Sequence, residues 1–472
     1  MKLWRIAGVL FLIGAEALLY GYSYPFFSLA LEKRELANWL IGFNASIAGA
    51  GILFVGPFLP RAIDRLGINR LVALLFAVSF ASFGAILLVN HVVVWFAARF
   101  LMGTCFSALW TTTEIWLNGT VDDRHRGRII GGSGTLYAIC QFVAPLVLGV
   151  TGVAGNLPLI VAMVPLAFGA VVALLVPPLA AGEAEGHDET PHESNLKSAI
   201  ALAGPILIVS FLSGVGETAM QSLLPLYGLA HGLTDAGAAR LVAVFSLGEA
   251  FLVLVLGWMA DRLGRGFTLK VAGIVATTTV ALLPFAIGQP LFLNPILFFA
   301  GGAISGIYAL GVILIGQDFR GQRLAAVSTG FGMAYSAGSI VGSTPVGLAI
   351  DLLGPQALPV TIAASFFGLT VYLFLRDRRK DEASEAPIAG DAVVGLEPLF
   401  PLDLTLDENE AIDVEQAEIR DLQMRDDRQR QESDLKERFR QRAAEIARRG
   451  AERHQARTDE LERLQTHQPG KR

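Results

Sequence analysis

Twelve apolar segments, each long enough to cross a lipid bilayer as a helix, follow one another through the first 375 residues of the chain. Because a helix rises about 1.5 Å per residue, about 20 apolar residues span the hydrocarbon core of a membrane. A water-soluble protein could not cover a chain that is 53% hydrophobic and only 17% charged. We therefore predict an all-α integral membrane protein. The predicted transmembrane helices lie near residues 4–31, 37–59, 70–90, 92–117, 128–150, 156–176, 198–229, 238–260, 267–288, 292–316, 324–348 and 357–375.

Lys and Arg side chains are distributed unevenly between the two sides of the predicted membrane. With residue 1 placed inside, the inner segments carry eighteen of them, whereas the outer loops carry only Lys33 and Arg34. Cytoplasmic loops of membrane proteins are enriched in these side chains. We therefore predict a multi-pass protein of the cell (inner) membrane with both termini in the cytoplasm.

The two halves of the chain repeat three landmarks at a nearly constant offset. They are Asp64-Arg65-Leu66-Gly67 and Asp261-Arg262-Leu263-Gly264; Arg126-Gly127-Arg128 and Arg320-Gly321-Gln322-Arg323; and Glu16 with Pro25 and Glu217 with Pro225. Parallel repeats with a central pathway are typical of secondary transporters. The repeat predicts two pseudo-symmetric six-helix bundles, 1–176 and 198–376, joined by a cytoplasmic linker at 177–197. A charged cytoplasmic tail, 377–472, follows as a partly helical or disordered extension.

The motif after the eighth span resembles the signature of the major facilitator superfamily. Gly257-Trp258-Met259-Ala260-Asp261-Arg262-Leu263-Gly264-Arg265 fits it fully, whereas Pro60 replaces the leading Gly of the first copy. Arg99-Phe100-Leu101-Met102-Gly103 is similar to the family's fourth-helix pattern, and the stretch from Arg99 to Gln141 looks closest to the uncharacterised YcaD-like branch. The resemblance covers roughly residues 1–378 and implies transport by alternating access, with one bundle rocking against the other.

Carboxyl groups inside the predicted spans are the main candidates for binding solute or protons. An ionised side chain at mid-membrane costs about 3 kcal/mol on insertion scales unless it is paired or wetted. Glu16 and Glu217 occupy similar places in the first helix of each half, which line the central cavity in the resembling family. Gln221 lies one turn after Glu217 on the same face. We expect proton exchange or binding of a cationic group there; the alternative is a neutral Glu that is hydrogen-bonded within the bundle.

Arg99 and Glu249 complete the predicted substrate- and proton-binding residues. In the resembling family the position of Arg99 is tied to proton coupling or to substrate anions, but a long Arg stem also allows the guanidinium to reach the outer interface. Glu249 has no acidic counterpart in the first half. It lines the cavity or faces a neighbouring helix.

A second set of charged residues lies near the cytoplasmic ends of the spans, where ion pairs can close a gate in one conformation. We predict gating roles for Asp64, Arg65, Glu114, Arg126, Asp261 and Arg262. The sequence offers no nucleotide-binding loop, no metal-ligand spacing and no nucleic-acid-binding pattern. We therefore expect no enzymatic activity, no cofactor or metal, and no nucleic acid partner.

These observations predict a monomeric secondary transporter that moves a small solute, with proton-coupled efflux of an organic compound as the main hypothesis. Its partners are a small-molecule substrate, protons and the lipid bilayer. Uptake of a polar metabolite or sugar is the nearest alternative. A non-transporting receptor or scaffold that acts through the tail is an alternative of a different class, and the sequence identifies no partner for that tail.

Overall fold

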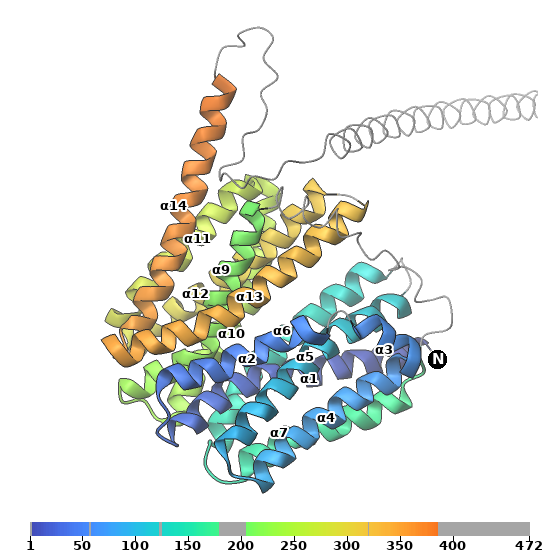
Figure 1. Ribbon diagram of the computed structural model, residues 1–472. Helices are drawn as coiled ribbons and strands as arrows, with labels where there is room; N and C mark the ends of the chain where they lie inside the picture. The colour runs from blue at the N-terminus through green and yellow to red at the C-terminus, as the bar shows by residue number, and fades with distance from the viewer. Residues whose placement is uncertain (1, 56–57, 122–124, 179–203, 320, 386–472) are drawn as a thin grey trace, which may run out of the picture. The chain divides into compact units, whose positions relative to one another are not determined.

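The computed structural model describes residues 2–55, 58–121, 125–178, 204–319 and 321–385 (Figure 1). These residues form thirteen helices and no strand. The first half contains α1 (Lys2–Glu32), α2 (Asn38–Val55), the short α3 (Leu59–Leu66), α4 (Ile68–Leu88), α5 (Val92–Thr120), α6 (Arg126–Thr151) and α7 (Leu157–Leu175). The second half contains α9 (Gly204–Ala230), α10 (Asp235–Leu263), α11 (Arg265–Ala286), α12 (Pro290–Asp318), α13 (Gly321–Leu353) and α14 (Ala357–Glu385).

The helices agree with the predicted spans. Within the described residues, eleven helices are long and apolar enough to cross a membrane. The 18-residue α2 corresponds to the one remaining predicted span and precedes the separate short helix α3. The prediction of an all-α integral membrane protein is confirmed. The last helix continues to Glu385, ten residues beyond the predicted end of its span, and residues 386–472 of the predicted tail lie outside the described part.

The repeated motif has the same backbone conformation in both halves. Gly67 ends α3 with φ 78° and ψ 149°, and Gly264 ends α10 with φ 88° and ψ 145°. An L-residue with a side chain rarely adopts these angles, so glycine is required at both turns. The helix before the motif differs: Asp261 and Arg262 lie in the last turn of α10, whereas Asp64 and Arg65 lie on the separate α3. The symmetry therefore extends to the turns but not to the continuity of the helices.

The helix ends form two faces. One face, called the terminal face here, contains the N-terminal end of α1 and the turns at Gly67 and Gly264. The other, called the opposite face, contains the connections at 33–37, 89–91, 152–156, 231–234, 287–289 and 354–356. Contacts between loops establish the opposite face. Lys33 and Asp235 form an ion pair, Arg34 donates a hydrogen bond to Asn90, and Gln356 is hydrogen-bonded to His231. The N-terminal end of α1 lies at the terminal face, where Gly8 packs on Val176.

The two halves are joined at the opposite face. The Asp351 carboxylate of α13 accepts hydrogen bonds from the Asn38 backbone N–H at 3.0 Å and from the Trp39 backbone N–H at 2.9 Å. It therefore satisfies two donors at the N-terminus of α2, where a helix favours negative charge. Deeper in the membrane, the Ser46 and Thr344 hydroxyls are hydrogen-bonded at 2.9 Å.

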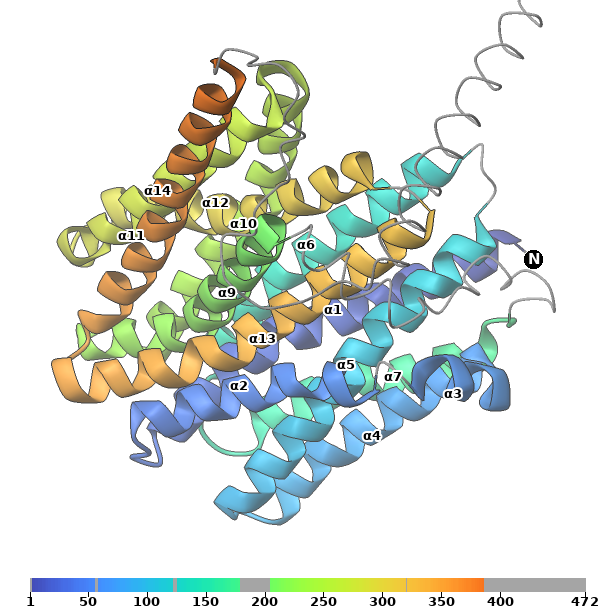
Figure 2. The same ribbon diagram turned by 45° about the horizontal axis from the view of Figure 1, so that its top comes forward.

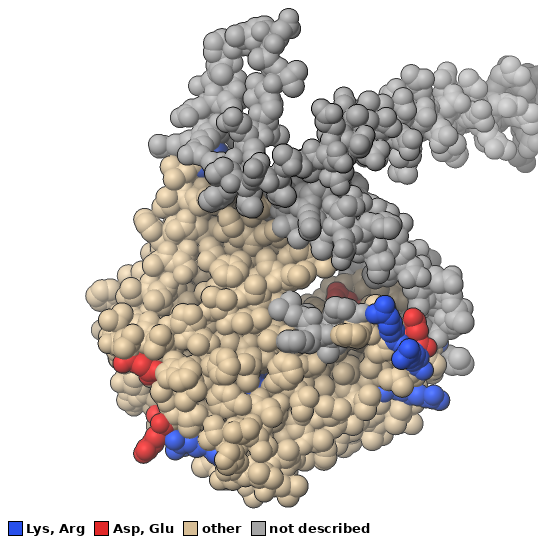
Figure 3. All heavy atoms as spheres, in the orientation of Figure 1, with Lys and Arg blue, Asp and Glu red and all other residues tan. Residues whose placement is uncertain are grey.

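Glycines allow α2 and α13 to approach closely (Figures 1 and 2). A Cβ at Gly42 would lie 2.2 Å from the Ser343 carbonyl oxygen, and a Cβ at Gly347 would lie 2.4 Å from the Asn38 carbonyl oxygen. Small residues at helix contacts in membranes serve this purpose. On the terminal side, glycines of α6 and α13 (Gly131, Gly132, Gly134 and Gly332) have no such neighbours within 4 Å. Figure 3 shows a hollow in the described surface, with an acidic side chain inside it.

We expect Gly42→Ala to lower the apparent melting temperature of the purified protein, because the added methyl group would overlap the backbone of α13. Overpacking of this kind costs about 1–3 kcal/mol. Gly368→Ala is the matched control, since no atom lies within 4 Å of a Cβ at that position in α14. Equal melting temperatures for both variants would contradict the close contact between α2 and α13.

Candidate functional site

The Glu217 carboxyl group lies in α9, next to a hydrogen-bonding amide one turn later. The Gln221 Nε2 donates a hydrogen bond to Glu217 Oε1 at 3.4 Å. The Glu217 carboxyl group also interacts with the side chain of Tyr335 of α13. Glu217 is partly exposed, whereas the neighbouring residues Gly216 and Thr218 are buried. The carboxyl group therefore faces an accessible space and is not enclosed in a packed core.

Glu249 of α10 lies behind Gln221. It is 8% exposed and interacts with the side chains of Ser246 and Gln221 as well as electrostatically with Glu217. Its Oε1 atom has no hydrogen-bond partner among the described residues. Gln221 is therefore positioned between two carboxyl groups. The structure brings together three of the predicted site residues, Glu217, Gln221 and Glu249, and places Glu249 on the inside of the protein, away from lipid.

Four tyrosines from both halves surround Glu217. Its carboxyl group interacts electrostatically with the hydroxyls of Tyr20 in α1, Tyr137 in α6, Tyr308 in α12 and Tyr335 in α13. All four side chains are partly exposed. The rings of Tyr308 and Tyr335 lie edge to face with centroids 5.0 Å apart, and the Tyr137 ring lies 4.6 Å from Trp110 in the same arrangement. Aromatic side chains of both halves therefore lie within electrostatic range of the partly exposed Glu217.

Glu16 of α1 borders this cluster through Tyr137, which interacts more strongly with Glu16 than with Glu217. Glu16 is 1% exposed, its Oε2 atom has no hydrogen-bond partner among the described residues, and it interacts electrostatically with Tyr137 and Cys140 of α6. Gly14 of α1 packs against α6, and Gly214 of α9 packs against the equivalent helix α13.

The offset of 200 that relates these glycines also relates Pro25 to Pro225. It aligns Glu16 with Gly216, one residue before Glu217. One residue turns a side chain by about 100° around a helix. The two glutamates therefore occupy similar depths but point in different directions.

Arg99 of α5 is directed into the first half and does not extend to the opposite face. Its guanidinium is buried, with the residue 1% exposed, and Nη1 donates a hydrogen bond to the Ser23 hydroxyl at 2.8 Å. The guanidinium carbon lies 4.3 Å from the ring centroid of Tyr24 and 5.0 Å from that of Phe27. Nε and Nη2 have no partner among the described residues. These contacts indicate a cation–π site for the Arg itself.

The residues expected to form a gate are dispersed over the terminal face. Asp64, Arg65, Asp261 and Arg262 are exposed, and the side chain of Arg126 lies outside the described part. Glu114 instead lines a cavity of about 110 Å³ together with Trp110, Asn118 and Ser133, and interacts electrostatically with Tyr308 across the two halves. The gating roles remain a prediction.

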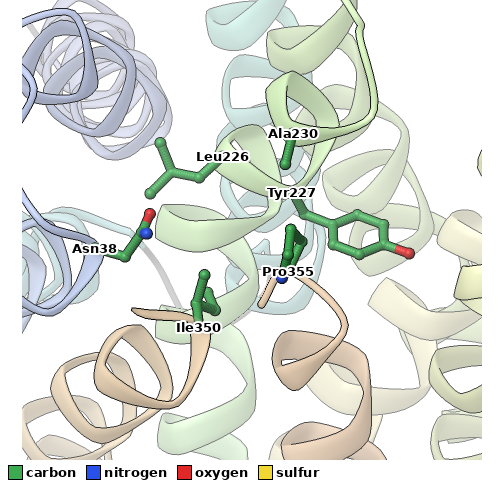
Figure 4. A pocket seen from close by; sticks show the side chains of 6 residues that line it. All are labelled: Asn38, Leu226, Tyr227, Ala230, Ile350 and Pro355. Carbon is green, nitrogen blue, oxygen red and sulfur yellow. The ribbon is translucent and has the colours of Figure 1, made fainter. Parts of the chain in front are cut away.

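A second cavity, of about 130 Å³, lies between the halves at the opposite face (Figure 4). It is lined by Asn38, Leu226, Tyr227, Ala230, Ile350 and Pro355. Pockets that enclose organic ligands usually measure about 300–1,000 Å³, so this cavity is too small for a solute. The described residues contain no group of three or more His, Cys, Asp or Glu side chains that could hold a metal ion. The site around Glu217 is therefore the main candidate.

Comparisons with known proteins agree with this architecture. The sequence matches the model of the Major Facilitator Superfamily over residues 6–342 and 241–423. It is 26% identical to the uncharacterised MFS-type transporter YcaD of Escherichia coli O9:H4 (strain HS) over 353 residues, which cover 74% of this chain and 88% of YcaD. The uncharacterised MFS-type transporter YfkF of Bacillus subtilis (strain 168) is 23% identical over 342 residues, covering 70% and 85% of the two chains. The predicted YcaD-like branch is confirmed.

Solved structures show the same fold at low sequence identity. The nucleoside transporter NupG has a TM-score of 0.67 at 14% identity, covering 79% of this chain and 98% of NupG. A variant of the peptide transporter POT has a TM-score of 0.64 at 16% identity, covering 79% and 94%. The fold, the family model and the transporter relatives agree. The chain is therefore a secondary transporter, not an enzyme, and belongs to the major facilitator superfamily.

Proposed function

We propose that this transporter exports a small organic compound in exchange for protons, from a site centred on Glu217. The observation that supports this proposal is the cluster of Glu217, Gln221 and Glu249, in which one amide lies between two carboxyl groups. We place the protein in the cell (inner) membrane as a monomer. The terminal face, which carries the Lys- and Arg-rich segments, lies in the cytoplasm.

The charge balance of the buried residues favours protons as the coupling ion. The carboxyl groups of Glu16 and Glu249 are buried and that of Glu217 is partly exposed, whereas Arg99 is the one buried Lys or Arg among the described residues. Arg99 is hydrogen-bonded to Ser23 and covered by rings. Removal from water favours the neutral form of a carboxyl group, and two neighbouring carboxylates oppose each other's ionisation. The group of carboxyls therefore needs bound protons or a bound cation.

Competition at one carboxyl group also gives the direction of transport. If a solute and a proton bind to Glu217 in turn, each crossing of the solute is followed by a proton crossing the other way. Because the protonmotive force drives protons inward across a bacterial inner membrane, the solute is driven outward. Export is therefore favoured over uptake of a polar metabolite, such as the nucleosides that the structural neighbour NupG transports.

Alternating access requires the two halves to separate at the opposite face. In the structure they are held together there by Asp351 at the N-terminus of α2 and by the Ser46–Thr344 hydrogen bond. We propose that the bundles 1–176 and 198–376 rock about the site. In this motion, ion pairs close the terminal face while the opposite face opens. The residues that form these ion pairs are Asp64, Arg65, Glu114, Arg126, Asp261 and Arg262.

We expect Glu217→Gln to lower the initial rate of proton-driven ethidium accumulation in everted membrane vesicles by about tenfold or more, because the amide cannot exchange a proton. Glu35→Gln is the control, since Glu35 is an exposed carboxylate in the loop after α1. It should keep the rate of the unchanged protein. A Glu217→Gln protein that folds normally and transports at the same rate would contradict the proposed site.

A disulfide across the opposite face should stop transport reversibly. In a Cys105→Ala/Cys140→Ala background, oxidation of Ser46→Cys/Thr344→Cys joins α2 to α13, since the two hydroxyl oxygens lie only 2.9 Å apart. We expect flux to fall by about tenfold or more on oxidation and to return with a thiol reductant. Ser46→Cys alone should be insensitive to the oxidant. Full flux through the cross-linked protein would rule out opening at this face.

Removal of residues 386–472 distinguishes a transporter from a receptor or scaffold that acts through the tail. The contacts of the proposed site lie in α1, α6, α9, α10, α12 and α13. We therefore expect the truncated protein to retain flux within about twofold of the full chain at equal membrane abundance. Loss of flux in a truncated protein that is inserted and folded would favour the receptor or scaffold hypothesis.

A further inference from the structure

The residues around Glu217 also indicate which class of solute the site takes. This inference rests on the proposed function, because it concerns the same site. We propose that the solute is a monovalent organic cation whose charged group binds beside Glu217, between the aromatic rings of Tyr20 and Tyr137 from the first half and of Tyr308 and Tyr335 from the second.

The composition of the site favours a cation over an anion or a sugar. Glu217 and Glu249 supply negative charge, and Glu114 adds a further carboxyl group within electrostatic range of Tyr308. The Arg99 guanidinium contacts Ser23, Tyr24 and Phe27 and also interacts electrostatically with Tyr20, whereas Glu217 and Glu249 are not among the groups that act on it. A sugar would need several amides and hydroxyls arranged around its edges. The one amide at Glu217, that of Gln221, is engaged with the two glutamates.

The aromatic walls are suited to an organic ammonium or phosphonium group. An aromatic ring attracts a cation placed over its face, with a larger effect where water is excluded. Tyr308 and Tyr335 meet edge to face at 5.0 Å, as do Tyr20 and Tyr24 at 5.1 Å. Tyr335 interacts electrostatically with Tyr24, and Tyr20 with Tyr335, so the two pairs lie within electrostatic range of each other across the halves. A hydrated metal ion could not use these apolar ring faces, whereas an organic cation buries its alkyl or aryl groups on them.

The exchange at Glu217 balances in charge. When the cation arrives, the O–H bond of the protonated carboxyl group breaks, the proton leaves to water, and the electron pair stays on the carboxylate that faces the cation. The groups that face Glu217 are Tyr20 of α1, Tyr137 of α6, Glu249 of α10, Tyr308 of α12 and Tyr335 of α13, with Gln221 on its own helix. One positive charge therefore replaces another, and the net charge of the buried cluster is unchanged.

Binding of two ions of equal shape and opposite charge tests the inference. Tetraphenylphosphonium and tetraphenylborate are equilibrated by dialysis with the purified full chain, with protein-free micelles as the blank. We expect saturable binding of the phosphonium alone, weakened about tenfold or more in Glu217→Gln and unchanged in Glu35→Gln. Titration in two buffers of different ionisation enthalpy should show release of about one proton per cation bound. Equal binding of both ions, or no loss in a folded Glu217→Gln protein, would overturn the inference.

The aromatic contribution is tested at Tyr308, whose ring contacts those of Tyr335 and Phe331. Tyr308→Leu should weaken phosphonium binding about fivefold more than Tyr308→Phe, because only phenylalanine keeps the ring face. Equal effects of the two substitutions would exclude the cation–π contact.

Proton-driven flux of a neutral solute that depends on Glu217, without phosphonium binding, would refute the cation but retain the proposed export. Phosphonium binding without proton-driven flux would refute the proposed export but retain the cation.

Discussion

The cost of placing a carboxyl group in a membrane governs the arrangement of this protein. Each buried glutamate must be neutral, paired or in contact with water, because an isolated charge in the hydrocarbon core costs several kcal/mol. The three glutamates meet this requirement differently. Glu217 faces an accessible space and is hydrogen-bonded to Gln221, Glu249 is enclosed behind the same amide, and Glu16 is buried against α6. Of these three, Glu217 is the one that is partly exposed, and this is why the proposed chemistry is centred there.

Close helix contacts at the opposite face keep this space closed on one side. Gly42 and Gly347 bring the backbones of α2 and α13 together, and Asp351 occupies the N-terminus of α2. These contacts are short and directional, so they are made fully or not at all as the helices separate. Such joints behave as two-state elements, since packed interfaces do not deform continuously. The same contacts that stabilise the present conformation can therefore be released together.

Much of the fold could be predicted from the sequence, because hydrophobic segment length and the repeated motif depend on local patterns. The spans and the glycine turns at Gly67 and Gly264 follow from such patterns. The directions of side chains could not be predicted as well. A shift of one residue between Glu16 and Glu217 turns the side chain by about 100°, and the packing of Gly14 and Gly214 establishes that the register is the one that relates Pro25 to Pro225. Asp351, Ser23 and the grouping of the tyrosines depend on contacts between residues far apart in the chain, which carry no local signal.

The division of the site between the two halves links binding to movement. The carboxyl groups of the proposed site, Glu217 and Glu249, belong to the second half, while Tyr20 and Tyr137 of the first half interact electrostatically with Glu217. A ligand held by both sets binds most strongly when the halves are close and loses part of its contacts when they separate. A ligand shifts a conformational equilibrium only by its difference in affinity for the two states. In the proposed mechanism, the tyrosines of the first half supply that difference in affinity. The glutamates of the second half bind either a proton or the solute.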